Sequence, residues 1–226
     1  MLFRSLFLNL DNKLRIYNSY NCESTLYRLL HPDPASEPLW KRVEAAERKL
    51  LEYSDLVLYC SEDDLSAFKS LAPRAKFAAH HAPNGTSVLA GQVRHKTNPA
   101  IESAVFMGSA HPPNIEAAQK IVREIAPSNP SITFHILGRC LPKGKYPKNI
   151  VRHGFVTDSA KQALLQSADL AINPMGTGSG SNIKVLDFFS QGIPVLSSEF
   201  GMRGIKAIHE QHCVLADEDD FTNTLQ

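Results

Sequence analysis

Residues 168–204, ADLAINPMGTGSGSNIKVLDFFSQGIPVLSSEFGMRG, give the clearest indication of the fold. Its apolar run at residues 169–174 is typical of a buried strand. A turn that is rich in glycine follows this run, with Gly176, Gly178 and Gly180. Ser181 or Asn182 can then cap a helix, and a second apolar run begins at residues 193–196. The pattern predicts a strand, a glycine-rich turn, a helix and a further strand.

A glycine-rich turn that enters a helix is suited to an anion, because free backbone N–H groups and the positive end of the helix dipole point at the ligand. Glycines also let a phosphate approach the backbone closely. Lys184, early in the expected helix, can add a full positive charge. Asp187, one turn later on the same face, can accept hydrogen bonds from sugar hydroxyls. Together these groups suit a nucleoside diphosphate with an attached sugar.

The composition excludes several classes of protein. The 226 residues are 43% hydrophobic and 21% charged, and the formal net charge of +1 gives no overall field that would favour nucleic acid. The apolar start is short and interrupted by polar residues, so we expect neither a signal peptide nor a membrane span. Four cysteines without a CxxC pair favour reduced thiols, no metal and a cytoplasmic location: Cys22, Cys60, Cys140 and Cys213.

Strands and helices alternate along most of the chain. Strands are expected at residues 14–17, 55–60, 76–81, 104–107, 132–137, 150–152, 169–174 and 193–196. Helices are expected at residues 37–53, 61–71, 114–125 and 159–167, and a last one begins near 217. This alternation predicts parallel α/β sheets with right-handed crossovers. Residues 86–101 lack periodicity, so we place a boundary there between expected domains 1–90 and 91–226.

Ligands of parallel sheets bind at the carboxyl ends of the strands. The glycines that follow expected strands should therefore gather along one edge: Gly108, Gly138, Gly154 and the turn 176–180. His80 and His81 are adjacent on an expected strand, so their side chains point to opposite faces and cannot chelate one metal.

The second half resembles the C-terminal lobe of GT-B-fold glycosyltransferases of the retaining group 1 type, also called family 4. Six segments carry this resemblance in the family's order: AVFMGSAHPPNIEAA, FHILGR, NIVRHGFVTD, SADLAINPM, GSGSNIKVLDFFSQGIPVLSS and FGMRG. The first 90 residues are similar to the end of the family's N-terminal lobe, through YNSYNCES, the helix 44–51, SDLVLYCSEDD and APNGT. The resemblance implies Rossmann-like sheets of GT-B type, truncated at both ends.

The resemblance also implies an activity. A glycosyltransferase of this type moves a sugar from a nucleoside-diphosphate donor to an acceptor, with retention of configuration and without a cofactor or metal. The expected acceptor is a saccharide, a lipid-linked or another small molecule, and peripheral contact with a membrane would fit it. Residues 1–90 would form a partial acceptor-side lobe, and residues 91–226 the nucleotide-sugar-binding lobe.

Two departures from the family pattern affect the expected site. The family often carries two glutamates eight positions apart, where this chain has Ser179 and Asp187. An arginine and a lysine that commonly follow the lobe's first strand are missing after Gly108. The resemblance therefore leaves neutralisation of the diphosphate to Lys184, the helix N-terminus and Arg139.

The expected catalytic residues are Lys184 and Asp187. The leaving diphosphate needs fixed donors aimed at its developing charge, which Lys184 and the amides of residues 179–182 would supply, and Asp187 would accept hydrogen bonds from the ribose hydroxyls. The nucleobase is expected near the loop 154–156. The expected substrate-binding residues are Gly108, Ser109, His111, Arg139, Phe155, Val156, Gly178, Ser179, Gly180, Ser181 and Asn182.

Several residues also have plainer explanations. Asn114 can first be the N-cap of its helix, and His111 and Arg139 can simply be exposed. Glu199 and Arg203 can contact a donor or only stabilise their own loop.

Other functions share part of this pattern. The strand, the two turn glycines and Glu199 imitate the fingerprint of an NAD-dependent oxidoreductase. Against that reading, Ser181 occupies the third glycine position, and the motif lies late in its domain. A nucleotide-sugar epimerase, or a donor-binding lobe that performs no transfer, would carry the same fold.

Overall fold

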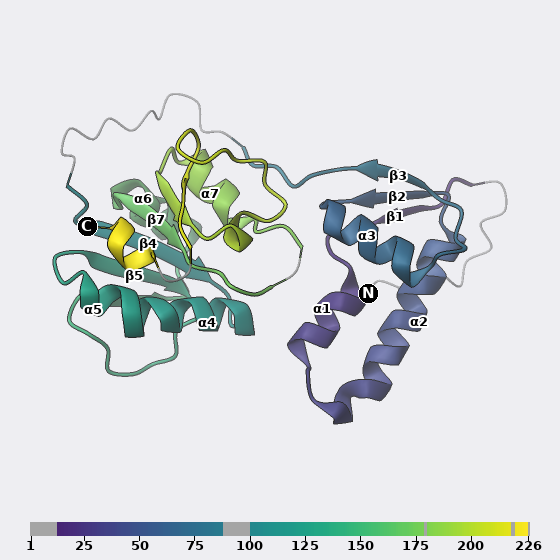
Figure 1. Ribbon diagram of the computed structural model, residues 1–226, viewed down its shortest axis with the longest axis horizontal. Coiled ribbons are helices and arrows are strands. Elements are labelled where there is room, and N and C mark those ends of the chain that lie inside the picture. The colour runs from purple at the N-terminus through teal and green to yellow at the C-terminus, as the bar shows by residue number, and fades with distance from the viewer. Residues whose placement is uncertain (1–12, 88–99, 179, 218–219, 226) are drawn as a thin grey trace. The chain divides into compact units, whose positions relative to one another are not determined.

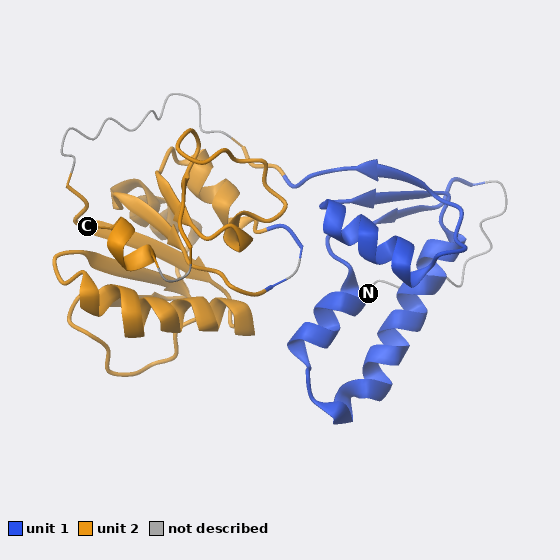
Figure 2. Cartoon of the chain, in the orientation of Figure 1, with its two compact units in different colours: residues 1–84, 178–181 blue, residues 85–177, 182–226 orange. Residues whose placement is uncertain are grey.

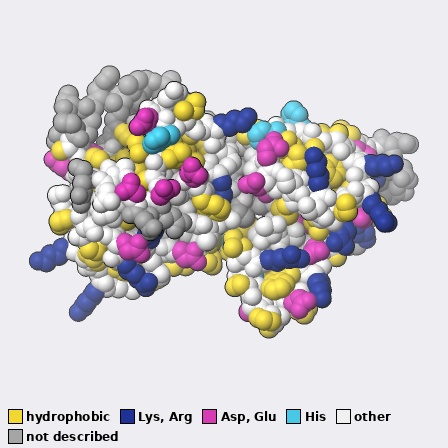
Figure 3. Space-filling model, viewed as in Figure 1, with side chains coloured by type: hydrophobic (Ala, Val, Ile, Leu, Met, Phe, Trp, Pro, Cys, Tyr) yellow, Lys and Arg dark blue, Asp and Glu magenta, His cyan; other side chains and the backbone are white. Residues whose placement is uncertain are grey.

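The computed structural model describes residues 13–87, 100–178, 180–217 and 220–225. The chain folds into two compact units (Figure 2). Unit 1 comprises residues 1–84 together with 178–181, and unit 2 comprises residues 85–177 together with 182–226. Charged side chains of both signs are interspersed over the visible face of each unit (Figure 3).

Unit 1 is a three-stranded parallel sheet covered by helices (Figure 1). The strand order is β1-β2-β3, with bounds Ile16–Asn18, Leu56–Tyr59 and Ala78–His81. Its helices are α1 (Glu23–Leu30), α2 (Glu37–Tyr53) and α3 (Glu62–Leu71), and a 3₁₀ turn spans Pro34–Ser36. The core includes Leu51, Val57 and Phe68, which come from α2, β2 and α3.

Local sequence explains α3 but not α1. Ser61 caps α3 as predicted, because its Oγ accepts a hydrogen bond from the N–H of Asp64 at 3.2 Å. Helix α1 was not expected, since its N-cap residue Cys22 makes no capping bond with its side chain. The first N–H groups of α1 donate instead to the carboxylate of Glu47, which is 25 residues after Cys22 in the chain. Sequence periodicity cannot reveal such a distant cap.

Glu47 is a buried carboxylate, only 2% exposed. Its Oε1 accepts hydrogen bonds from the N–H of Glu23 at 2.7 Å and from the hydroxyl of Tyr17 at 3.2 Å. Its Oε2 accepts one from the N–H of Ser24 at 2.8 Å. These bonds satisfy N–H groups that a helix leaves open at its first turn, where a negative charge is favoured by the dipole. Burial and Glu47 together raise the pKa of Tyr17.

We expect Glu47→Gln to destabilise unit 1 by about 2 kcal/mol, because an amide NH₂ would face a backbone N–H that needs an acceptor. Trp40 is the single tryptophan of the chain and lies on the same helix, so its fluorescence in a urea titration measures the change. Glu52→Gln, an exposed change on that helix, is the matched control and should shift the midpoint little. Equal midpoints for both variants would contradict this role of Glu47.

Unit 2 contains a six-stranded parallel sheet of order β6-β5-β4-β7-β8-β9. The strands, in chain order, are β4 (Ser103–Gly108), β5 (Thr133–Gly138), β6 (Ile150–Gly154), β7 (Leu170–Asn173), β8 (Val195–Ser197) and β9 (Val214–Leu215). This is the doubly wound order in which the chain reverses direction between its first and fourth strands, here β4 and β7. Ligands bind outside the carboxyl ends at such a switch point.

Helices cover both faces of this sheet (Figure 1). One face carries α4 (Pro112–Lys120), a π-helical turn (Ile121–Ile125), α5 (Ala126–Ser128) and α8 (Phe221–Thr224). The other carries α6 (Asp158–Ser167) and α7 (Lys184–Ser190). A short 3₁₀ turn, η4, spans Phe200–Met202.

Alternate side chains of each strand supply the two apolar layers. On β5, fully buried Phe134 and Ile136 pack toward α4, and Leu137 packs toward α6 and α7. The predicted α/β class with parallel Rossmann-like sheets is thus confirmed. The helix expected at 114–125 begins earlier, at Pro112, and changes to a π-helical turn at Ile121.

Candidate active site

Lys184 is the first residue of α7, and its half-buried side chain reaches residues of β4 and α4. Its Nζ donates a hydrogen bond to Oδ1 of Asn114 at 2.6 Å and lies 3.5 Å from Sδ of Met175. The same atom lies 4.7 Å from the ring centre of Phe106, within the range of a cation–π contact. An amide, a thioether and an aromatic ring therefore surround the ammonium group, and none of these partners carries a charge.

Removal from water disfavours a charged amine. Burial lowers the pKa of Lys184 to about 7, and the nearby charge of Arg203 also lowers it, whereas Cys140 opposes the shift. The pKa of Arg203 itself is lowered by burial to about 10. An arriving anion would favour the charged form of Lys184, because it supplies the opposite charge that the surroundings lack.

Two glycines at the ends of neighbouring strands allow the strands to approach closely beside Lys184. Gly108 and Gly138 are register partners at the carboxyl ends of β4 and β5. A Cβ on Gly138 would lie 2.1 Å from the carbonyl oxygen of Gly108, and Gly138 also has a φ of +88°. The same carbonyl accepts a hydrogen bond from the N–H of Cys140 at 3.2 Å. Only glycine fits at position 138, and Gly108, Gly138 and Gly154 end three adjacent strands as predicted.

Asn114 does not cap its helix, contrary to the prediction. The N-cap position of α4 is His111, and Asn114 lies three residues further on. Its Oδ1 accepts from Lys184, and its Nδ2 donates to Oγ of Ser109 at 3.2 Å. Ser109 and His111 are exposed in the loop after β4, where the prediction placed them.

Asp187 points to a different neighbour from Lys184, although both lie on α7. One of its carboxylate oxygens, Oδ2, lies 3.3 Å from Nζ of Lys161 on α6. Both side chains of this ion pair are more than a third exposed, so the pair contributes little to stability. The carboxylate is therefore accessible to a polar ligand, but the two residues expected to act together contact separate partners.

The glycine-rich turn differs from the prediction in its details. Residues 178–181 group with unit 1, and Ser179 lies outside the described residues. The N-cap of α7 is Ile183, without a capping side chain, so neither Ser181 nor Asn182 caps this helix. Ser181 Oγ donates instead to the carbonyl oxygen of Cys60 at 3.4 Å. Gly178 and Gly180 both have positive φ, which explains why glycine is needed there.

Asn182 belongs to a buried polar network that the sequence did not indicate. Its N–H donates to the carbonyl oxygen of Arg203. Contrary to the prediction, this amide is therefore not free to bind an anion. Its Nδ2 donates to the carbonyl oxygen of Gly201 at 2.8 Å, which also accepts from Nδ2 of Asn173 at 2.9 Å. Ser198 Oγ donates to the carbonyl oxygen of Met175 at 2.6 Å. The network ties the loops after β7 and β8 together.

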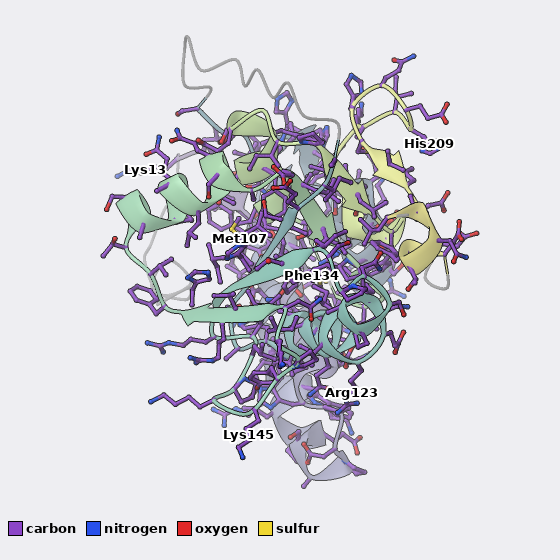
Figure 4. The ribbon with its side chains drawn as sticks, turned by 90° about the vertical axis from the view of Figure 1, so that its left-hand side faces the viewer. Lys13, Met107, Arg123, Phe134, Lys145 and His209 are labelled. Carbon is purple, nitrogen blue, oxygen red and sulfur yellow. The ribbon has the colours of Figure 1, made fainter. Side chains whose placement is uncertain are left out.

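Arg139, Phe155 and Val156 occupy the loops after β5 and β6. The guanidinium carbon of Arg139 lies 5.7 Å from the ring centre of Phe155, which is 78% exposed. Val156 is partly buried and packs against the core beneath α6. Lys145, in the same loop as Arg139, extends away from the sheet (Figure 4). Arg139 and Phe155 thus present an exposed pair at the same edge of the sheet as Gly108.

The remaining candidates have local structural partners. Arg203 Nη1 donates to the carbonyl oxygen of Phe200 at 3.2 Å, and Glu199 is the N-cap residue of the turn η4. His81 contacts the carbonyl oxygen of Cys60 and stacks on Tyr59. Over the residues described, no cluster of three or more His, Cys, Asp or Glu side chains could hold a metal, and all four cysteines are free and buried.

No helix in the described segments is long and apolar enough to cross a membrane.

Several comparisons place this geometry among known folds. TarM of S. aureus is similar at a TM-score of 0.66 and 12% identity, over 98% of this chain and 44% of TarM. HepE of Anabaena, solved with UDP and glucose, has a TM-score of 0.63 and 15% identity, over 93% of this chain and 59% of HepE. Sucrose-phosphate synthase of Thermosynechococcus elongatus has a TM-score of 0.62 and 16% identity, over 92% and 56%.

This chain therefore spans about half the length of these solved structures. At such low sequence identity, the likeness shows the GT-B type of fold and does not show which ligands this chain binds. A search of curated proteins found no significant match. The family model described as "Glycosyl transferases group 1" matches residues 102–226, more than half of the chain and nearly all of unit 2. The chain belongs to the group 1 glycosyl transferase family.

Proposed function

We propose that this chain binds a nucleoside-diphosphate sugar at the carboxyl edge of the unit 2 sheet and transfers the sugar to an acceptor. The observation that carries the proposal is Lys184, a half-buried ammonium with uncharged partners at the switch point between β4 and β7. An isolated buried charge is costly unless a ligand pairs with it. A diphosphate is the anion that this family and this position in the fold favour.

The chemistry requires negative charge to be stabilised as the glycosidic bond breaks. The bond between the anomeric carbon and the diphosphate oxygen breaks, and its electron pair stays on the diphosphate. The acceptor's hydroxyl oxygen bonds to the anomeric carbon, and its proton passes to the departing diphosphate. A fixed ammonium at the diphosphate oxygen lowers the barrier, because its attraction grows as the charge develops. Lys184 has this role in our proposal. Asp187 accepts hydrogen bonds from the ribose hydroxyls, and Arg139 and Phe155 lie where the nucleobase would bind.

Further features of the proposal come from the family resemblance. Residues 1–90 belong to the acceptor side and residues 91–226 to the donor side, and transfer proceeds with retention. The acceptor is a saccharide, a lipid-linked or another small molecule. A uridine donor has the best support, because HepE was solved with UDP-glucose. The cytoplasmic location and the peripheral membrane contact stay predictions.

Calorimetric titration of the whole chain with UDP, GDP, ADP and NAD tests the proposal. We expect UDP to bind, and Asp187→Ala to weaken its binding about 10-fold, because ribose hydroxyls lose a charged acceptor. Asp158→Ala, another surface aspartate of unit 2, is the matched control and should leave the affinity unchanged. Binding of NAD alone would favour an oxidoreductase, and unchanged affinity in Asp187→Ala would contradict the assignment of the ribose side.

A second measurement separates an active transferase from a lobe that only binds the donor. Release of UDP from UDP-glucose, followed with a panel of saccharide acceptors, should increase when a suitable acceptor is present. Donor binding without any acceptor-dependent release would identify a donor-binding lobe that lacks transfer activity.

A further inference from the structure

The side chain of Asn114 connects the loop after β4 to Lys184. Its Oδ1 lies 2.6 Å from Nζ of Lys184, and its Nδ2 donates to Oγ of Ser109 at 3.2 Å. An ammonium group can only donate, so the amide oxygen must face it, and the amide nitrogen then faces the serine hydroxyl. Both ends of the amide are therefore used, and its orientation is determined.

The backbone beneath Asn114 leaves room for this arrangement. A Cβ on Gly108 would lie 2.7 Å from Cβ and 2.8 Å from Cγ of Asn114, closer than side chains tolerate. Asn114 lies in the first turn of α4, which begins directly after the loop that Gly108 starts. The absence of a side chain at position 108 thus allows the amide to approach the end of β4.

We propose that Asn114 is a positioning residue, which holds the Lys184 ammonium at the carboxyl end of β4, ready for the diphosphate of the donor. This inference rests on the proposed function, in which Lys184 binds that diphosphate. Without Asn114, the ammonium would lose its one oxygen acceptor among the described contacts and keep only a thioether and an aromatic ring.

The charged form of Lys184 depends on this oxygen. The titratable groups that act on Lys184 are Cys140, from the loop after β5, and Arg203, from the loop after η4. Neither would replace a lost acceptor, since Arg203 is itself a cation and burial raises the pKa of Cys140 to about 11. Removing the amide oxygen should therefore favour the neutral amine.

Titration of Lys184 in the free chain tests this part directly. The ¹³Cε resonance of Lys184, assigned by its loss in Lys184→Met, should titrate in Asn114→Ala at a pH lower by about one unit, because a hydrogen bond to the charged form is lost. Asn114→Asp keeps the shape and adds a negative charge, so it should move the titration to higher pH. Gln119→Ala, on the same helix, should leave it unchanged.

Donor binding supplies the second readout. With UDP-glucose as the probe, Asn114→Ala should bind about 10-fold more weakly than the wild type at pH 8, yet nearly as well at pH 5.5. A merely structural role would weaken binding equally at both pH values. Thermal unfolding of each variant shows whether the fold is retained, and Asn114→Asp tests the proposal if Asn114→Ala does not fold.

The outcomes separate this inference from the proposed function. If Lys184→Met binds UDP-glucose as the wild type does, the proposed function fails. If Lys184→Met loses binding but neither Asn114 variant moves the titration of Lys184, the proposed function stands and the role of Asn114 is wrong.

Discussion

Lys184→Met should bind UDP-glucose about 50-fold more weakly than the wild type at pH 6, a loss of about 2.3 kcal/mol. Methionine keeps the apolar stem beside Phe106 and Met175 and removes only the charge. The expected loss is the attraction between a partly desolvated ammonium and the diphosphate. Calorimetry gives the two dissociation constants.

The pH dependence of the wild type provides an internal check. The pKa of Lys184 is about 7, so the free protein carries the ammonium below that pH and loses it above. A bound diphosphate raises this pKa, and donor affinity is therefore highest below pH 7 and falls as the pH rises through 7. UDP-glucose suits this experiment because neither of its phosphates titrates near neutral pH. The variant should show no such fall.

Lys184→Met should weaken donor binding without lowering the stability of the fold. Because the folded chain holds Lys184 at a lower pKa than the unfolded chain, the unfolded state binds more protons between pH 7 and about 10.5. The penalty for the buried charge is thus fully present below pH 7 and disappears at higher pH. Lys184→Met removes this penalty, so its melting temperature at pH 6 should equal or exceed that of the wild type.

Lys145→Met is the matched control for the loss of a lysine charge. Lys145 is exposed in the loop between β5 and β6, and the change should leave both affinity and pH dependence unaltered. A Lys184→Met protein that is folded and binds UDP-glucose with wild-type affinity at pH 6 would contradict the assignment.

Gly138→Ala should destabilise unit 2 by more than about 4 kcal/mol, because two separate penalties act at this position. The φ of +88° is strained for any residue with a Cβ. The added Cβ would also lie 2.1 Å from the carbonyl oxygen of Gly108, an atom of a neighbouring strand that cannot rotate away. The strands β4 and β5 would have to separate, and this would displace the loop after β4 and the first turn of α4, which carries Asn114.

Chemical denaturation followed by far-UV circular dichroism measures this effect. Gly85→Ala is the matched control, because its Cβ would meet nothing within 4 Å, and it should change stability by less than about 0.5 kcal/mol. Trp40 fluorescence, which reports on unit 1, follows the other unit in the same samples. A stable Gly138→Ala protein would show that the approach of the two strands is less tight than the geometry indicates.

Patterns in the sequence were enough to predict the alternation of parallel strands and helices and the glycines at the strand ends. They also indicated Lys184, whose role in donor binding stays a prediction. These predictions follow from local patterns, because side-chain periodicity and glycine punctuation act over a few residues. Ser61 as the cap of α3 belongs with them, since a cap and its helix are neighbours in the chain.

The partners of the candidate residues depend on the tertiary structure. Asn114 was expected to cap a helix, yet it contacts Lys184 from 70 positions away. Asp187 pairs with Lys161 on another helix, a partner that no local pattern indicated, and its sharing of a ligand with Lys184 stays a prediction. Helix α1 was missed because its capping carboxylate, Glu47, lies 24 residues beyond its first residue. A hydrogen bond depends on where the folded chain brings two atoms, and no local pattern contains that information.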